Sequence, residues 1–280
     1  PAFPLPGTDQ FNSLFQDIIS KPVTEGGAVV TDQSKLWHTE GMYNLSNKLK
    51  VVDLVVGASY RQYWIDSKGT VFADEPGKPI TFYIFGAYAQ VAKAFWNERF
   101  KASMSARYDK HENFDGEFTP RFSMTYSLDP DKNHNIRASY QTAFRFPSTA
   151  DQWTDFDIGY YRAIGGLPEM QQKYGFNDSP VYPLSGTNPI TDEPVLDNGP
   201  FVIPAFRPEK VTAMELGYKG LNFREMLYVD AYIYHNEYQG FLASQLLAMH
   251  PFTPQEARFQ TTISTEDKLS SYGLSLIHIS

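Results

Sequence analysis

The sequence predicts an all-β protein, an antiparallel up-and-down transmembrane β-barrel of which about nine strands are present. Segment after segment alternates apolar and polar residues over about ten positions. That is the length of a strand that crosses a bilayer, and roughly twice the length of an ordinary globular strand. The connections between these segments alternate between short and long, as periplasmic turns and outer loops do. The chain contains no run of about 18 apolar residues, so transmembrane helices are not expected.

The clearest pair of strands is a long hairpin over Glu117–Ser148. From Phe118 to Leu128 the apolar residues occupy the even positions, and polar residues, with Arg121 among them, occupy the odd positions. After a polar turn over Asp129–Asn135 the alternation resumes. Because successive side chains of a strand point to opposite faces, this pattern predicts one face in lipid and one face on a wet lumen.

Six further segments are predicted strands, of which Thr81–Phe95 has two less distinct faces, and a final strand near the end of the chain is poorly defined. In chain order the six are Trp37–Asn47, Val51–Asp66, Thr81–Phe95, Phe100–Asp109, Lys210–Lys219 and Glu225–Tyr238. Residues 1–36 show no such alternation. Their apolar side chains recur at helical spacing from Phe11 to Ile19, and Pro22 ends the pattern. We therefore expect an extracellular loop that contains a short amphipathic helix.

The connections divide into two classes by length. The short ones are Asn47–Lys50, Trp96–Arg99, Asp129–Asn135 and Gly220–Arg224, and the long ones are Ser67–Pro79, Lys110–Gly116, Ser148–Phe206 and Gln239–Ala257. Residues 148–206 show no strand pattern and are rich in Pro, Gly, Asp and aromatic residues, so we expect a long extracellular loop without regular structure.

Composition excludes several classes of function. The net charge of −8 argues against nucleic acid as a partner, and the absence of cysteine excludes thiolate chemistry and disulfides. The histidines are scattered without ligand spacing. The acidic turn that begins at Asp129 departs from a calcium loop at His134, where glycine is needed, and at Tyr140, where glutamate is needed. We expect no metal, no cofactor and no catalytic residues, and hence no enzyme.

Six segments resemble, in their order and spacing, the β-barrel of TonB-dependent outer-membrane receptors. They are Gly57–Asp74, Gly86–Gln90, Ala106–Phe114, Pro120–Tyr126, Ile136–Ser148 and Phe206–Gly220, which cover most of the chain between Trp37 and Phe241. The most specific are IRASYQTAFRFPS in the fifth and the PEK…ELGYK pattern in the sixth. The resemblance implies a barrel of roughly 22 strands closed by an N-terminal plug. It also implies a Gram-negative outer membrane and TonB-driven uptake of a scarce nutrient: a siderophore, a cobalamin-like cofactor, an oligosaccharide or a peptide.

The resemblance also implies partners. These are the TonB complex, bound through an N-terminal region outside this chain, the plug, outer-membrane lipid and a small nutrient ligand, and a surface lipoprotein is a further candidate. Two alternatives remain open: a passive porin-like channel, and a soluble carbohydrate-active β-protein.

Two groups of residues are candidates for function. The first consists of charged residues on the polar strand faces, which either hold the plug and guide cargo or form ordinary lumen salt bridges: Arg61, Arg107, Arg121, Arg137, Arg145, Glu215 and Asp230. The second consists of aromatic residues of the longest loop, which either stack on a sugar or a flat ligand or pack the loop against itself: Trp153, Tyr160, Tyr161, Tyr174 and Tyr182.

The two ends of the chain suggest an interior fragment. It begins with Pro-Ala-Phe and no signal-peptide pattern. Residues 274–280 (LSLIHIS) resemble the translation of a sequencing adapter, so we expect residues 37–273 to be the native partial barrel, the alternative being a native strand end.

Overall fold

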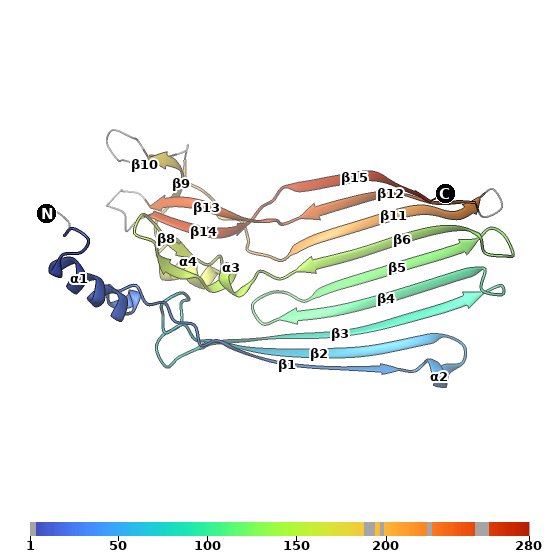
Figure 1. Ribbon diagram of the computed structural model, residues 1–280, viewed down its shortest axis with the longest axis horizontal. Coiled ribbons are helices and arrows are strands. Elements are labelled where there is room, and N and C mark those ends of the chain that lie inside the picture. Colours follow the sequence, from blue (N-terminus) through green and yellow to red (C-terminus); the bar gives the residue numbers. More distant parts are fainter. Residues whose placement is uncertain (1–3, 188–193, 197–198, 223–225, 250–257, 280) are drawn as a thin grey trace.

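The structure, a computed structural model, describes residues 4–187, 194–196, 199–222, 226–249 and 258–279. One long antiparallel sheet of nine strands dominates these residues (Figure 1). In spatial order its strands are β1 (Lys35–Asn44), β2 (Asp53–Ile65), β3 (Ile80–Phe95), β4 (Phe100–His111), β5 (Glu117–Ser127), β6 (His134–Arg145), β11 (Glu209–Asn222), β12 (Leu227–Gln239) and β15 (Lys268–Ile279). The predicted strands are confirmed, although the predicted start of one strand at Glu225 lies outside the described residues.

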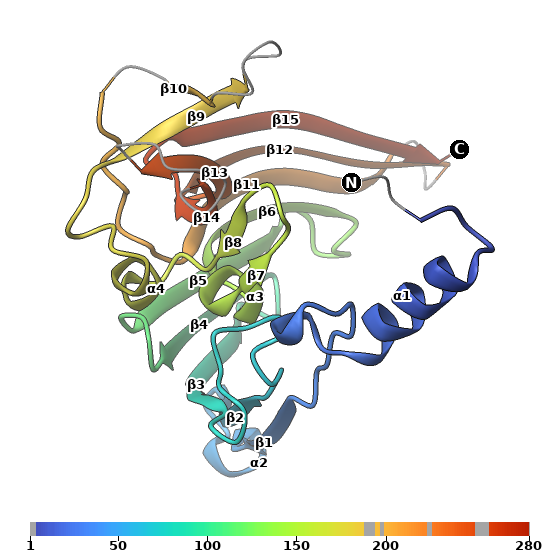
Figure 2. The same ribbon diagram turned by 90° about the vertical axis from the view of Figure 1, so that its left-hand side faces the viewer.

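The sheet is curved, and its two faces differ as the alternation predicts. Seen from the end that carries the long connections, the strands form an arc (Figure 2). Met124 of β5 lies opposite Ala138 of β6, Ala138 opposite Leu216 of β11, and Leu216 opposite Ile233 of β12. Residues in register share a face, and Met124, Leu216 and Ile233 are all exposed. An apolar row therefore crosses the strands on one face, and the arginines of the strands lie on the other.

Short connections gather at one end of the sheet, which we call the turn end. The first contains a single-turn helix, α2 (Ser46–Leu49). The connection between β3 and β4 has three successive residues with positive φ, Trp96, Asn97 and Glu98. In the β5–β6 turn the Asp129 carboxylate accepts the backbone N–H groups of the fourth and fifth residues after it, at 3.0 and 2.7 Å. Asp129 thus closes a turn through local hydrogen bonds.

The long connections, at the opposite or loop end, correct one expectation. The prediction that Ser148–Phe206 lacks regular structure is wrong, and the long connection predicted over Gln239–Ala257 contains a strand. The first segment contains α3 (Thr149–Trp153), β7 (Asp155–Asp157), β8 (Arg162–Ile164), α4 (Pro168–Lys173), β9 (Val181–Thr187) and β10 (Pro194–Leu196). The second contains β13 (Leu242–Met249), and β14 (Arg258–Ser264) follows. These strands form a second sheet in the order β10-β9-β13-β14-β8-β7, and we call this assembly the cap.

The cap has a hydrophobic core of its own, which we call the loop core. Its buried side chains come from three of the long connections: Phe114, Ile164, Leu167, Met170 and Phe259. The remaining long connection joins through backbone hydrogen bonds, from Ala73 N–H to the Trp153 carbonyl and from Asp155 N–H to the Val71 carbonyl. The loops therefore pack as one body over the end of the curved sheet.

The N-terminal residues form the predicted helix, α1 (Asp9–Ser20). The Thr8 hydroxyl caps its start by accepting the N–H of Phe11, and the chain leaves the helix at Lys21, before Pro22. Thr70 ties the following segment to the β2–β3 connection, because its hydroxyl accepts from Thr31 N–H and its Oγ1 also lies 2.9 Å from the Thr31 carbonyl. Among the described residues, no helix has the length and apolar character needed to cross a membrane.

The last strand of the sheet includes most of the tail that resembles an adapter. Residues 274–279 continue β15 in register with β12, from Leu274 opposite Ile233 to Ile279 opposite Tyr228. Such pairing uses backbone groups that any sequence other than proline supplies. The interpretation of residues 274–280 as adapter sequence therefore stays a prediction.

Candidate ligand-binding site on the concave face

Three of the arginines predicted to face the lumen are neutralised by a carboxylate. Arg107 forms a bidentate pair with Asp109, at 2.7 and 2.6 Å. Arg137 reaches from β6 to Asp230 of β12 at 2.8 Å, and Arg145 reaches Glu209 at 2.5 Å. These three arginines form salt bridges, which is one of the two interpretations given above for the charged residues of the strand faces.

Two of these pairs belong to a recurring arrangement of glycine, tyrosine, arginine and aspartate. Tyr88 lies opposite Gly57 in the β2–β3 register, and the guanidinium of Arg107 lies 5.9 Å from the ring centre of Tyr88. A Cβ on Gly57 would lie only 2.5 Å from a ring carbon of Tyr88, so the ring needs the glycine beneath it. Tyr232 lies opposite Gly217 in the same way, with Arg137 at 5.2 Å from its ring centre.

The other three charged residues predicted to face the lumen have no ion pair among the described residues. Arg121 lines a hollow of about 360 Å³ that also contains Glu40 and Tyr88. Glu215 lies on β11 opposite Ser139 of β6. Arg61, on β2, lines a separate cavity where the curved sheet meets the cap. The structure therefore distributes the predicted charged residues along the wall and places only Arg61 and Arg145 in this cavity.

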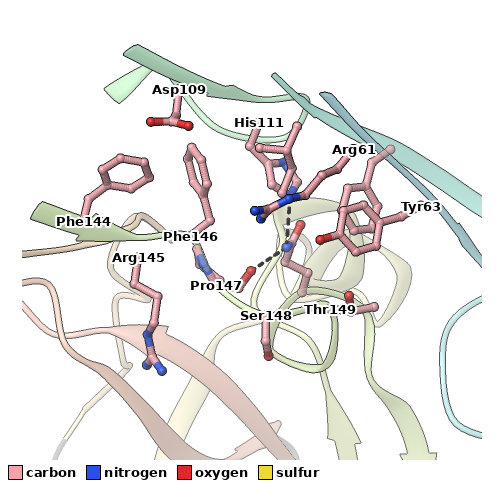
Figure 3. Close-up of a pocket in the computed structure, with 13 residues that line it drawn as sticks. Arg61, Tyr63, Asp109, His111, Phe144, Arg145, Phe146, Pro147, Ser148 and Thr149 are labelled. Atoms are coloured by element: carbon pink, nitrogen blue, oxygen red, sulfur yellow. Dashed lines mark hydrogen bonds between the residues drawn. The ribbon is translucent and has the colours of Figure 1, made fainter. Parts of the chain in front are cut away.

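This cavity, of about 320 Å³, is the candidate ligand-binding site (Figure 3). Figure 3 shows Arg61 and Tyr63 on one side and Phe144 and Phe146 on the other, with His111 between them. Its lining comes from the loop ends of four strands and from the start of the longest connection: Arg61, Tyr63, Phe82, Ile84, Asp109, His111, Phe144, Arg145, Phe146, Pro147, Ser148, Thr149 and Gln152.

A buried polar network fixes one wall of the cavity. Gln152 donates to the Pro147 carbonyl at 2.7 Å and accepts from Asn113 at 2.9 Å. The backbone N–H of Asn113 donates to Nδ1 of His111 at 3.0 Å, and the His111 ring stacks on Phe82 with centroids 4.8 Å apart. His111 and Gln152 are both about 1% exposed. Buried polar groups whose hydrogen bonds are made hold a unique local geometry, so this wall is preformed.

The five aromatic residues predicted to bind ligand lie in several different elements. Trp153, at the end of α3, and Tyr174, just after α4, pack against the loop core. Tyr160, 73% exposed, and Tyr161 lie in the connection between β7 and β8. Tyr182 lies in β9. Packing of the loop against itself thus accounts for Trp153 and Tyr174, and a ligand-stacking role for the others stays a prediction.

A charged cluster anchors the cap beside these aromatics. The Asp155 carboxylate accepts hydrogen bonds from Arg162 at 2.6 Å, Lys173 at 2.7 Å and the Tyr174 hydroxyl at 2.6 Å. Burial alone would raise the pKa of Asp155, but these three hydrogen bonds outweigh it and hold that pKa below its ordinary value. Burial and the bond to Asp155 raise the pKa of Tyr174, so the phenol stays protonated. The cluster is a structural clamp between β7, β8 and α4.

Sequence reasoning missed most of the cavity lining. His111 comes from the end of a strand and Gln152 from the short helix α3, and neither belongs to a sequence motif. One signal was available: Tyr63 and Phe82 interrupt the polar face of their strands at the loop end, and their rings stack at 4.6 Å. Large apolar residues on a lumen face indicate a place where something covers the wall.

Comparison with known proteins agrees with this architecture. The family model described as "TonB dependent receptor-like, beta-barrel" matches residues 6–276. No curated protein matches the sequence. The siderophore receptor PirA from Pseudomonas aeruginosa has a similar structure, with 15% sequence identity and a TM-score of 0.56 over 87% of this chain and 37% of that one.

Two further receptors give the same result. A mutant of the ferric enterobactin receptor PfeA from Pseudomonas aeruginosa has 14% identity and a TM-score of 0.56, over 86% of this chain and 32% of that one. The FrpB iron transporter from Neisseria meningitidis has 14% identity and a TM-score of 0.50, over 88% of this chain and 33% of that one. The chain spans about a third of the length of these proteins. With its nine-stranded curved sheet, it belongs to the TonB-dependent receptor family and forms part of that family's β-barrel.

Proposed function

We propose that this chain forms part of the wall and the outer cap of a TonB-dependent transporter that carries a small nutrient across a Gram-negative outer membrane. The observation that carries the proposal is that the curved sheet has apolar side chains on its outer face and charged side chains on its inner face. Its exposed convex face is apolar, and its concave face holds paired charges. Such a sheet suits lipid on one side and water on the other.

Each part of the chain has a role in this proposal. The cap captures the ligand from outside and the cavity beneath it receives the ligand. The concave wall then faces a plug, whose rearrangement by TonB opens a passage. The plug and the region that binds TonB belong to the N-terminal part implied by the family. Since the concave arginines at positions 107, 137 and 145 are already neutralised, the wall offers the plug a polar surface of low net charge.

An iron chelate is the first cargo to test, because solved structures that resemble this one are those of siderophore receptors and an iron transporter. Cobalamin-like cofactors, oligosaccharides and peptides are the other classes. A surface lipoprotein remains a candidate partner.

The test begins with the gene read through both ends of this chain. A signal peptide, a TonB box and a plug upstream, with further alternating strands downstream of Gly273, would support the proposal. Uptake by the full-length protein should then require TonB. Uptake that persists without TonB would indicate a passive porin, and a full-length protein that is soluble without detergent would indicate a soluble β-protein.

A further inference from the structure

We infer that the cavity beneath the cap is a subsite for an anionic oxygen group of the transported ligand, held by Arg61 and attached to a flat apolar body. This inference rests on the proposed function, because it places one part of the transported ligand in the cavity at the loop end of the sheet. It concerns the cavity of about 320 Å³ in Figure 3.

The first argument is the charge balance of the cavity. Its lining contains Arg61, Arg145 and Asp109 as charged groups. Arg145 is neutralised by Glu209 and Asp109 by Arg107. His111 accepts a hydrogen bond at Nδ1, so that nitrogen holds a lone pair and the imidazole carries no charge. Arg61 is left as a cation without an acidic partner among the described residues.

The second argument is the chemistry of an unpaired guanidinium. Arginine keeps its charge at any physiological pH and presents a planar fork of N–H donors that matches carboxylates and phosphates. The cavity wall beside Arg61 includes the apolar side chains of Phe82 and Ile84. Arg61 is itself exposed, so its guanidinium is open to a ligand that enters the cavity.

The third argument is the shape of the other walls. Tyr63 stacks on Phe82 at 4.6 Å, and Phe144 meets Phe146 edge to face at 4.8 Å. Ring surfaces on both sides of the cavity favour a flat apolar group between them. The volume is near the lower end of ligand pockets, roughly 300–1,000 Å³, so the cavity takes one arm of a larger ligand.

The fourth argument is that several side chains of the cavity are already held in place before a ligand binds. Gln152 is held by two hydrogen bonds, and Ser148 and Asp151 form a reciprocal capping box at the start of α3. The loop core fixes the position of this segment over the strands. A preformed cavity spends little binding energy on immobilising its own side chains.

The experiment is site-resolved arginine labelling of the full-length wild-type protein in outer-membrane vesicles. Phenylglyoxal modifies accessible guanidinium groups, and peptide mass spectrometry reports each arginine separately. The probes are benzoate, which is flat and anionic, acetate, which is anionic only, and benzamide, which is flat only. Arg121 is the matched control, since it lies on the same face, has no ion pair with any described residue and lines a different hollow. Arg107 serves as the paired reference.

The expected result is rapid labelling of Arg61 that benzoate slows at a concentration about fivefold lower than acetate, with no effect of benzamide. Labelling of Arg121 should respond equally weakly to all three. In a Tyr63→Leu variant the advantage of benzoate over acetate should shrink while protection by acetate remains.

Two results would overturn the inference. One is an Arg61 that labels like Arg121 and gains no selective protection from benzoate. The other is an Arg61 that resists labelling before any anion is added, which would mean that the protein's own plug already supplies the carboxylate. If TonB-dependent uptake persists in either case, the subsite fails and the proposed function stands.

Discussion

The curved sheet and the cap belong to one chain but are built for opposite surroundings. In the sheet, Met124 and Ile233 point outward and are exposed, and the pair of Arg137 and Asp230 lies inside. In the cap, Met170 and Phe259 are buried, and Glu169 and Lys173 of the same helix as Met170 are exposed. Since the apolar groups of both regions avoid water, we infer that water lies inside the arc of the sheet and outside the cap.

The largest effect should come from emptying the loop core. Phe259→Ala removes a ring that contacts Tyr174 and Phe176, and should cost about 3–5 kcal/mol of local stability. Hydrogen exchange of the full-length protein should show lost protection in β8, β13 and β14 and unchanged protection in β5 and β6. Equal loss in both regions would mean that sheet and cap fold as one cooperative unit.

A second test concerns the outer face of the sheet. Met124→Arg should cost roughly 2–4 kcal/mol if this residue faces the middle of the bilayer, and Thr125→Arg, which faces the lumen, much less. Denaturant titration of the full-length protein in lipid vesicles measures both. Similar losses at the two neighbouring positions would refute the lipid-face assignment.

The glycine beneath Tyr88 provides a third and smaller test. Gly57→Ala should cost about 1–3 kcal/mol, because the new methyl group collides with the Tyr88 ring. Gly41→Ala in the adjacent strand is the matched control, since a Cβ there meets nothing within 4 Å. A Tyr88→Ala change should rescue most of the Gly57→Ala loss, and failure to rescue would assign that loss to the backbone.

The smallest effect expected is a pH dependence confined to the cap. The folded-state pKa of Asp155 is lowered, so its contribution is fully present above the unfolded pKa of about 3.9 and is lost as pH falls through the lower folded value. Fluorescence of Trp153, which packs on the loop core, should therefore change at acidic pH. The Asp155→Asn protein should lack this acid transition. An unaltered transition in that variant would place its origin elsewhere.

The sequence predicted the sheet better than the cap for physical reasons. A strand such as β5 repeats its two-face pattern over eleven residues. That length is sufficient to recognise the period and the ends of the strand from the order of its apolar and polar residues. β7 and β8 have three residues each, and β8 pairs in parallel with β14, almost a hundred positions away. No local pattern encodes such a partner. A short strand in the cap is defined by tertiary pairing rather than by its own sequence.

The candidate site shows the same division. Arg61 was predicted to face the lumen because its strand alternates, and the register confirms that it shares a face with Ile84 of β3. That Arg61 has no carboxylate partner among the described residues was not predictable from its own strand, because Arg137 and Arg145 take their carboxylates from other strands. His111 and Gln152 meet through the fold and are 41 positions apart.

The close packing of the Tyr88 ring on Gly57 has a consequence for the width of the passage in the proposed transporter. A tyrosine that stood upright from the wall would project its whole phenol toward the axis of the barrel. Because Gly57 lets the Tyr88 ring lie against the sheet, the wall keeps an aromatic surface and the ring narrows the barrel interior only a little. In the proposed transporter, Gly57 thus leaves room for a solute to pass Tyr88.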